Sequence, residues 1–589
     1  MLARYFAAHP LTDVCYAPQF PPMKDRAVWE TVAPADRETL IAYAEEWHAR
    51  PWPMLTAGMF ASFIRTGSRR DCETPYFDRR RKLCSAALHV CLTGKEDMLP
   101  DVEDGLVLLC EETTWAISAH AGLSAEHPFP DEQRTVVDLF AAQTAMILSF
   151  VCQLLEGTLH PDIHDRVRRE VERRVLRPFM EYDGEWWMGF QRKDLNNWTP
   201  WILSNILMSA NVWQWGGAAL IERGCMMLDR WLAVVPEDGG CDEGAGYWNM
   251  AGGAFLDCLM VLESLCGVDL WGCEKVKRMM AYPELVYLGK GWFANFADCD
   301  ARPYISGERL QYAGEKTGNP ALVRMGVEMW GSPLKELNDT PHLSRVLMRI
   351  FAKPARAEAA AKDWRSVWLP DLQVRISDKD GMTVAMKGGH NNESHNHNDV
   401  GSFLVMAHDE MQVVDAGNMV YTAKTFSDRR YELWNCRAMY HNVPIIGGHE
   451  QQAGAQYAAR DVQEDVLGMA LDLAAAYPAE AGVLQCRRSF QHDITLSVRD
   501  EIVCVREQPV TWVFMLRHAP LIDQKAQCCE LSGSGFRIGW SGGAPLTAAV
   551  EEIKITDGRM AKSYPGSLWR LTLTAAPSTH HIQEFLFEA

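Results

Sequence analysis

Several features that would place this chain in a specialised class of proteins are absent from its sequence. No run of about eighteen apolar residues, the length that spans a membrane as a helix, is present. There is no low-complexity tract, and the start of the chain lacks the basic end, apolar core and cleavage site of a signal peptide. The sequence therefore predicts a globular, cytoplasmic protein that does not enter a membrane.

Paired cysteines of the kind that bind metals are also missing. The 17 cysteines are odd in number and scattered, and no two Cys-x-x-Cys units occur. Adjacent Cys528 and Cys529 are interpreted as two packed thiols. Free and mostly buried thiols are typical of a reducing compartment, which agrees with the cytoplasmic prediction.

A surplus of positive charge is absent as well, because the formal net charge is −19. We therefore expect no binding to nucleic acid or to an anionic membrane. An anionic saccharide would need a local basic patch. Three clusters are candidates, although each is also typical of a solvated helix face: Arg65, Arg69 and Arg70; Arg79, Arg80, Arg81 and Lys82; and Arg166, Arg168, Arg169, Arg173 and Arg174.

The 589 residues exceed what one hydrophobic core usually supports, so roughly two or three domains are expected. Residues 27–350 show helical spacing of apolar residues, which indicates helical hairpins in a toroid or, less favoured, a solenoid. The predicted helices are 38–47, 79–92, 100–111, 134–155, 164–182, 201–213, 216–234, 252–266 and 274–280.

Short alternating segments replace the helices after a charged, alanine-rich connector at residues 353–358. They predict an antiparallel β-sandwich, with a helical domain at 1–360 and the β-domain at 361–589. The predicted strands are 374–376, 382–387, 402–406, 412–415, 494–498, 502–505, 511–516 and 568–573.

The most polar motif is residues 394–403, Ser-His-Asn-His-Asn-Asp-Val-Gly-Ser-Phe. If residues 400–406 form a strand, this cluster lies at its mouth, where side chains can converge on a ligand. Residues two apart in an extended segment point the same way, so His395 and His397 are predicted to share one face.

Three further segments carry candidate residues. Asn196 and Asn197 precede Trp198, where they either cap a helix or present amides to a ligand. Tyr247 follows glycines in Asp-Glu-Gly-Ala-Gly-Tyr-Trp, either as a helix anchor or as a ligand contact. Asp415 and His441, together with His397, would make a three-ligand zinc site with a fourth position for water. Each histidine is equally compatible with a structural role.

Taken together, these segments resemble the heparinase II/III family of polysaccharide lyases. Residues 394–403 carry the most specific part of the resemblance. The segments around Asn197, Tyr247, Asp415 and His441 follow the order of that family's other blocks, as does an early block with Trp115 and His120. The similarity covers roughly residues 75–450. It implies an α+β protein in which an incomplete (α/α) toroid precedes an antiparallel β-sandwich.

The resemblance also implies an activity. These lyases cleave the bond to a 4-linked uronic acid by β-elimination, which removes the C5 proton and expels the O4 group. Such an enzyme must neutralise the uronate carboxylate and stabilise an enolate-like intermediate. The resemblance assigns that task to Asn197, with Asn196 as the alternative, and to His395. It implies an anionic oligo- or polysaccharide as substrate and leaves a homo-oligomer open.

Tyr247 matches the family's catalytic tyrosine, which acts as base and as acid on one face of the sugar. Lowering a tyrosine pKa from about 10 by about 2 units needs roughly 2.7 kcal/mol, expected from nearby cations. His395 is the candidate base for the opposite C5 epimer. His397, Asp415 and His441 match the ligands of a structural metal, expected to be zinc. Trp115, His120, Trp198 and Tyr431 are the candidate substrate contacts.

Two departures from the family leave alternatives open. Several relatives have histidine beside the neutralising asparagine, where this chain has Trp198 after Asn197. Many relatives are exported, so a cytoplasmic member is expected to act on imported oligosaccharides. The glycosaminoglycan type of substrate is favoured over alginate. A carbohydrate-binding scaffold without activity, or a glycoside hydrolase that uses Asp242 and Glu243, remains a different hypothesis.

Overall fold

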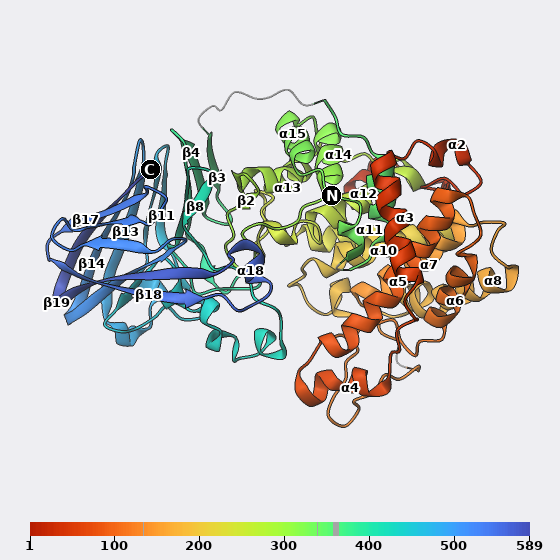
Figure 1. The fold of residues 1–589 in the computed structure, drawn as a ribbon, viewed down its shortest axis with the longest axis horizontal. Coiled ribbons are helices and arrows are strands. Elements are labelled where there is room, and N and C mark those ends of the chain that lie inside the picture. The colour runs from red at the N-terminus through yellow and green to blue at the C-terminus, as the bar shows by residue number, and fades with distance from the viewer. Residues whose placement is uncertain (134, 339, 357–364) are drawn as a thin grey trace. The chain divides into compact units, whose positions relative to one another are not determined.

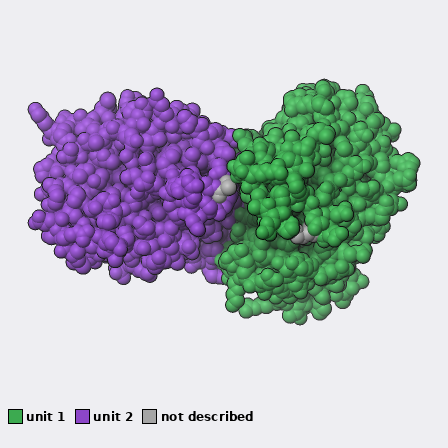
Figure 2. All heavy atoms as spheres, turned by 90° about the horizontal axis from the view of Figure 1, so that it is seen from below, with its two compact units in different colours: residues 1–235, 249–276, 306–357 green, residues 236–248, 277–305, 358–589 purple. Residues whose placement is uncertain are grey.

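The computed structural model describes residues 1–133, 135–338, 340–356 and 365–589. The chain divides into two compact units, coloured separately in Figure 2. The helical unit comprises Met1–Val235, Asn249–Val276 and Ser306–Ala357. The sheet unit comprises Pro236–Trp248, Lys277–Ile305 and Glu358–Ala589. The domain boundary predicted between residues 360 and 361 lies outside the described residues.

The helical unit can be followed from red to green in Figure 1. Its helices are α1 (Leu2–Ala8), α2 (Arg26–Trp29), α3 (Pro34–His48), α4 (Ala57–Thr66), α5 (Arg70–Thr93), α6 (Leu99–Cys110), α7 (Leu139–Leu154), α8 (Pro161–Val171), α9 (Arg177–Glu181), α10 (Trp198–Trp213), α11 (Gly217–Leu232), α12 (Gly252–Cys266), α14 (Gly307–Thr317), α15 (Pro320–Glu328), α16 (Lys335–Asn338) and α17 (Leu343–Phe351). Helix α13 (Glu274–Leu285) continues from this unit into the other.

Local signals explain where these helices begin and end. Helix α7 begins after Asp138, whose carboxylate accepts hydrogen bonds from the N–H groups of Phe140 and Ala141. Helix α5 ends at Gly94, which has a φ of 70°, a left-handed conformation that residues with a Cβ rarely adopt. The predicted helix 164–182 is broken into α8, a π-helical turn at Glu172–Leu176 and α9.

One apolar helical stretch, Ala245–Cys266, has the length and composition of a membrane span, and 67% of its apolar window is buried inside the protein. Within this stretch, the Asp257 carboxylate of α12 lies 3.0 Å from Arg309 and 3.0 Å from Arg345. Two buried guanidinium groups thus compensate the buried carboxylate. These contacts and the burial are those of a core helix.

The sheet unit contains a 15-stranded antiparallel sheet, drawn mainly in green-blue to blue in Figure 1. The path of neighbouring strands is β15-β16-β17-β19-β14-β8-β7-β5-β4-β3. Its strands are β3 (Arg365–Leu369), β4 (Val374–Lys379), β5 (Met382–Lys387), β7 (Phe403–Ala407), β8 (Glu410–Val413), β9 (Pro444–Ile446), β11 (Arg460–Asp465), β12 (Gly468–Asp472), β13 (Val483–His492), β14 (Leu496–Leu516), β15 (Pro520–Asp523), β16 (Cys528–Leu531), β17 (Arg537–Gly542), β18 (Leu546–Lys554) and β19 (Ser567–Glu588).

Shorter elements complete the unit. Strands β1 (Tyr287–Gly289) and β2 (Trp292–Phe293) form a small antiparallel pair, and β6 (His390–Asn391) pairs with β10 (Gly454–Ala458). Helix α18 (Met560–Ser563) precedes β19. The pair β1–β2 lies within the stretch that the sequence predicted as helical.

The core of the sheet unit forms where strands that are not neighbours pack together. Phe403 of β7 is fully buried, and its ring lies 5.5 Å from Phe490 of β13 and 5.3 Å from Phe587 of β19. Within the described part of the chain, β7 pairs with β5 and β8 and with neither β13 nor β19. The sheet therefore curves over one shared core, and Val400, shortly before β7, belongs to the same core.

The single strand β14 contains the predicted strands 502–505 and 511–516 and all but the first two residues of the predicted strand 494–498. Polar residues between them appeared to be turns, but Asp500 is buried and holds Arg488 at 2.6 Å. Pro509 lies where the register of β14 against β19 is irregular, a position that tolerates a residue without an N–H.

The second predicted basic cluster is not a surface patch. Arg79, Arg80, Arg81 and Lys82 are all buried within α5. Arg79 and Arg80 both bind the buried carboxylate of Glu112, at 3.2 and 2.8 Å. In the third cluster, Arg173 and Arg174 bind Glu170, each at 2.7 Å.

Candidate functional site

Residues 394–402 form a loop between β6 and β7, and this loop is not extended as predicted. His395 has a φ of 57°, which belongs to the left-handed region. That turn breaks the alternation of side chains, so His395 and His397 do not lie side by side on one face of a strand. They meet through a shared partner instead, as described below.

The loop is held in place by buried polar anchors. Lys387 of β5 lies 2.7 Å from Asp399 and 2.8 Å from Glu393. Gln451 accepts a hydrogen bond from the N–H of Val400 and donates one to its carbonyl. Because Lys387, Asp399 and Gln451 are buried, a hydrogen bond that one of them failed to make would be costly. The anchors therefore specify one conformation of the loop.

The segment that carries Tyr247 approaches this loop within the sheet unit. The carboxylate of Asp242 accepts a hydrogen bond of 3.0 Å from the N–H of Ser394. Gly244 has a φ of 91°, and a Cβ at this position would lie 2.6 Å from the Cβ of Cys299. Glycine is therefore required there, and the 3-10 turn Ala245–Tyr247 follows it.

A short chain of hydrogen bonds joins Tyr247 to His395. The hydroxyl of Tyr247 lies 2.5 Å from that of Tyr421. Tyr421 donates to Oδ2 of Asp298 at 3.2 Å, so the Tyr247 hydroxyl is the donor toward Tyr421. Nδ1 of His395 lies 2.8 Å from the same oxygen of Asp298. The rings of Tyr247 and His395 are 4.8 Å apart.

Asp298 is the residue that the sequence did not reveal. Its other oxygen, Oδ1, lies 3.0 Å from Nε2 of His397 and 2.8 Å from Nη2 of Arg430. Burial alone would raise the pKa of Asp298, but the hydrogen bonds from His395 and His397 and the charge of Arg430 hold it far below its usual range. Asp298 is therefore an ionised carboxylate that only accepts hydrogen bonds.

The pKa of Tyr247 contradicts the expectation of a lowered value. Burial raises it well above its ordinary value of 10, and Tyr421 and Glu243 raise it further. The cation expected beside Tyr247 lies over the neighbouring ring instead, since the guanidinium of Arg559 is 5.3 Å from the centre of Tyr421. Tyr247 is therefore a neutral phenol in the protein without substrate.

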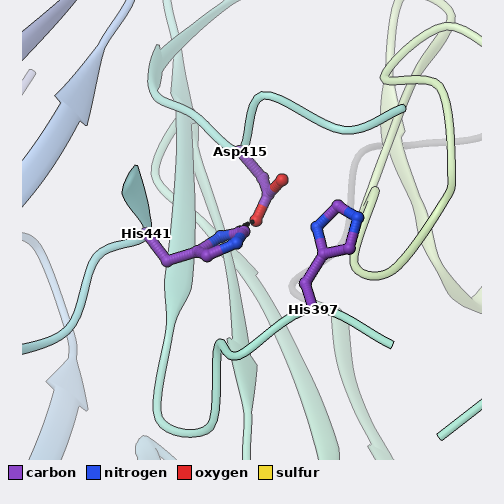
Figure 3. A group of neighbouring side chains, drawn as sticks. All are labelled: His397, Asp415 and His441. Atoms are coloured by element: carbon purple, nitrogen blue, oxygen red, sulfur yellow. Dashed lines mark hydrogen bonds and ion pairs between the residues drawn. The ribbon is translucent and has the colours of Figure 1, made fainter. Parts of the chain in front are cut away.

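His397, Asp415 and His441 converge on one point, as predicted, and Figure 3 shows them arriving from three separate segments. All three are buried, and one potential ligand atom of each lies within 4.8 Å of the others. Nδ1 of His441 lies 2.8 Å from Oδ2 of Asp415. Nδ1 of His397 and Nε2 of His441 are buried and have no hydrogen-bond partner among the residues that the structure describes.

The electrostatics of this group favour a cation. Burial alone would lower the pKa of His397, but Cys436 and Asp298 outweigh burial and raise it to about 10. Two histidines and a carboxylate are also a usual ligand set for zinc. The two unpartnered ring nitrogens are the donor atoms that a metal would use. The residues present therefore fit a bound divalent metal ion.

The amides predicted in the helical unit differ in what they do. Oδ1 of Asn196 accepts a hydrogen bond of 3.1 Å from the N–H of Trp198, so this side chain supports the start of α10. Asn197 occupies the cap position, is buried, and makes no side-chain cap hydrogen bond. The side chain of Asn196 is therefore engaged at the start of α10.

The aromatic candidates of the helical unit lie in two environments. Trp198 and His120 have ring centres 4.6 Å apart, and Nδ1 of His120 lies 2.8 Å from Asp138. Trp115 is 2% exposed, and its indole N–H donates to the carbonyl of Leu109. Arg174 lies over its ring. This is the environment of a core residue rather than that of a sugar platform.

Tyr431 lies close to His395 in the sheet unit. A cavity of about 300 Å³ is lined in part by His395, Asn396, Phe426 and Tyr431. The hydroxyl of Tyr431 accepts a hydrogen bond of 3.0 Å from Asn396. This volume is at the small end of the range for ligand pockets, so the cavity has room for a small ligand beside His395.

Comparison with known proteins identifies the domain that carries most of this site. Residues 361–565 match the family model described as "Heparinase II/III-like, C-terminal". The resemblance noted in residues 394–403 is thereby confirmed for this part of the chain. A search of curated proteins gave no match.

Solved structures share the fold of the chain at low sequence identity. A heparinase III aligns with a TM-score of 0.63 and 12% identity over 95% of this chain and 84% of its own. The heparan sulfate lyase HepC from Pedobacter heparinus gives 0.58 and 13% over 94% and 88%. The chondroitin AC lyase of Streptomyces coelicolor A3, solved in complex with chondroitin sulphate, gives 0.53 and 12% over 94% and 83%. A helical N-terminal part and a large antiparallel C-terminal sheet are thus common to these proteins.

Proposed function

Because this chain contains a heparinase II/III-like C-terminal domain, we propose that it is a polysaccharide lyase for glycans that contain uronic acid. The observation that carries the proposal is the linked group of Tyr247, Tyr421, Asp298 and His395 in one unit. The shared fold of heparan sulfate and chondroitin lyases supports it. The finer architecture belongs to the same proposal: an incomplete (α/α) toroid and a β-sandwich.

The reaction defines what the site must provide. The C5 proton of a uronate is weakly acidic, because the carboxylate beside it is already negative. A lyase therefore needs donors for the carboxylate and the enolate-like intermediate, a base at C5 and an acid at O4. The products are a new reducing end and a 4,5-unsaturated uronate, with no water consumed.

The geometry supports separate roles for the two central residues. Asp298 accepts the hydrogen of His395 Nδ1, which leaves Nε2 of His395 with a free lone pair for the C5 proton. Tyr247 holds its proton in the protein without substrate, which suits the acid that protonates the leaving O4. Action of Tyr247 as base as well remains the alternative for a substrate with the opposite C5 epimer.

The carboxylate-neutralising role stays assigned to Asn197, with Asn196 as the weaker candidate. Asn196 is the weaker candidate because its side chain already accepts a hydrogen bond from the N–H of Trp198 at the start of α10. His120, Trp198 and Tyr431 remain the proposed substrate contacts. The buried position of Trp115 favours a packing role for that residue.

We propose that His397, Asp415 and His441 hold a divalent metal ion, with zinc as the first candidate. Its contribution when bound is to cross-link the loop 394–402 to the segments of Asp415 and His441. The buried ring nitrogens of His397 and His441 and the carboxylate of Asp415, whose potential ligand atoms lie within 4.8 Å of one another, support this assignment. The proton transfers above use only side chains of the protein.

The substrate is proposed to be a glycosaminoglycan-type oligosaccharide, with oligoalginate as the alternative. We also propose that the protein acts in the cytoplasm. All 17 cysteines are free thiols in the structure, which supports a reducing compartment.

The test is a panel of heparan, chondroitin, hyaluronan and alginate oligosaccharides, monitored by the ultraviolet absorbance of a 4,5-unsaturated uronate. We expect absorbance to rise with at least one substrate, and Tyr247→Phe to lower kcat by about 100-fold or more. Reducing ends that appear without ultraviolet absorbance would indicate a hydrolase. Binding without any cleavage would indicate a carbohydrate-binding scaffold.

A further inference from the structure

We propose that Asp298 is the positioning residue of His395 in this reaction. It decides which ring nitrogen carries the proton, and with Arg430 it holds the backbone that presents the ring. The inference rests on the proposed lyase function and adds to it a residue outside every motif recognised in the sequence.

The first argument is the direction of the hydrogen bond. Asp298 is 1% exposed, and its carboxylate is paired at 2.8 Å with the guanidinium of Arg430, so its oxygens accept hydrogen bonds. The hydrogen between Asp298 Oδ2 and His395 Nδ1, 2.8 Å apart, therefore belongs to the imidazole. In the neutral ring this leaves Nε2 as the atom that accepts a proton.

The second argument is the backbone of His395. Its φ of 57° is a conformation that residues with a Cβ rarely adopt, so the surroundings must hold it. Arg430 donates to the carbonyl of His395 at 2.9 Å and to that of Asn396 at 2.9 Å. The same guanidinium lies 2.8 Å from Oδ1 of Asp298. One buried Asp–Arg pair thus fixes both the ring and the main chain of His395.

The third argument concerns the competing role of Asp298 at the metal group. Its Oδ1 lies 3.0 Å from Nε2 of His397, whereas Oδ2 faces His395 and Tyr421. A carboxylate that only supported His397 would need the contact of Oδ1 but not the contacts of Oδ2. The division of its oxygens indicates that Asp298 serves His395 directly and also links it to the metal group.

The experiment reads the tautomer of His395 directly. The intact protein labelled with ¹⁵N-histidine is compared with His395→Gln to assign the ring signals of His395. We expect the neutral ring to carry its hydrogen on Nδ1 in the wild type and to lose that preference in Asp298→Asn. If the wild-type ring carries its hydrogen on Nε2, the proposal is overturned, whether or not the variant folds.

Kinetics and metal content distinguish two roles of Asp298, the positioning of His395 and the support of the metal ligand His397. We expect Asp298→Asn to lower kcat by about 100-fold, with KM within about threefold and metal content unchanged. Asp500→Asn, which removes another buried carboxylate paired with an arginine, is the matched control. We expect this variant to keep the tautomer of His395 and the kcat of the wild type. Loss of metal in Asp298→Asn, with activity restored by added zinc, would overturn the proposal that Asp298 positions His395.

These outcomes remain distinct from failure of the proposed function. If the wild type cleaves no uronate-containing substrate while the ring signals respond to Asp298→Asn as expected, the lyase assignment is wrong and the positioning of His395 stands. If cleavage occurs and Asp298→Asn keeps full kcat, the lyase assignment stands and the positioning role is wrong.

Discussion

Replacing Glu308 with glutamine is expected to remove a pH-dependent weakness of the helical unit. Glu308 is 2% exposed and lies in the first turn of α14. The hydroxyl of Ser306 lies 2.9 Å from its carboxylate and 2.5 Å from that of Glu336. A hydroxyl has one hydrogen, so Ser306 can donate to only one of these carboxylates at a time.

The magnitude follows from the pKa. Burial raises the pKa of Glu308 from an ordinary 4.5 to about 7, and the nearby charge of Glu336 adds to this. Such a change corresponds to about 3 kcal/mol between the protonated and ionised forms. Because the folded value is the higher one, this stability is present below pH 4.5 and is lost as the pH rises through 7.

Glu308→Gln keeps the shape of the side chain and carries no charge at any pH. We expect the variant and the wild type to have similar free energies of unfolding near pH 4.5, and the variant to be more stable by about 3 kcal/mol at pH 8. Urea unfolding followed by far-ultraviolet circular dichroism, which reports on the helices, measures this difference. Glu315→Gln, on the exposed side of the same helix, is the control.

A difference between variant and wild type that stays constant from pH 4.5 to pH 8 would refute the reasoning. It would mean that Glu308 titrates alike in the folded and unfolded chain. If Glu315→Gln reproduced the effect, net charge rather than burial would be its cause.

Three further outcomes are expected. His441→Ala should abolish bound zinc, as measured by metal analysis, and lower the melting temperature. A chelator should likewise remove the metal from the wild type and lower its melting temperature, and it should leave the melting temperature of the variant unchanged. Asp500→Asn should destabilise the sheet unit by about 3 kcal/mol in urea unfolding, because Arg488 would keep a buried charge without its partner; an unchanged midpoint would contradict this. Phe403→Ala should lower the free energy of unfolding by about 3 to 5 kcal/mol, because the ring of Phe403 fills the core between β7, β13 and β19. A decrease below about 1 kcal/mol would show that the core closes over the cavity.

The parts of the fold that the sequence predicted best are long apolar segments. Helices α10 and α12 fall close to the predicted ranges, because most of their residues are apolar and buried, so that the apolar segment itself marks the helix. The length of β14 was not predictable in the same way. Asp500 is polar and nevertheless buried, and its burial depends on Arg488 of the neighbouring strand, a contact that no local pattern contains.

The same distinction between local pattern and distant contact applies to the residues of the candidate site. His397, Asp415 and His441 were predicted as a group, and the structure brings them together. Asp298 could not be predicted, because its flanking residues carry no recognisable motif and its partner His395 lies 97 positions along the chain. The left-handed backbone of His395 was missed for a related reason, since Arg430 and Asp298, rather than local preference, hold it. Tyr421 was not predicted as a site residue, because its role depends on contacts with Tyr247, Asp298 and His395, which lie in three other segments.

The way the chain is divided between the two units has a consequence for how this protein can be made and dissected. The chain crosses from one unit to the other five times, at 235/236, 248/249, 276/277, 305/306 and 357/358. Tyr247 and Asp298 reach the sheet unit on the two early excursions, whereas β14 and β19 are synthesised last. During translation the segments that carry Tyr247 and Asp298 are therefore synthesised before the strands that complete their unit. A fragment that begins at residue 361 would contain the matched domain but neither Tyr247 nor Asp298, so only the full-length chain is suited to activity measurements.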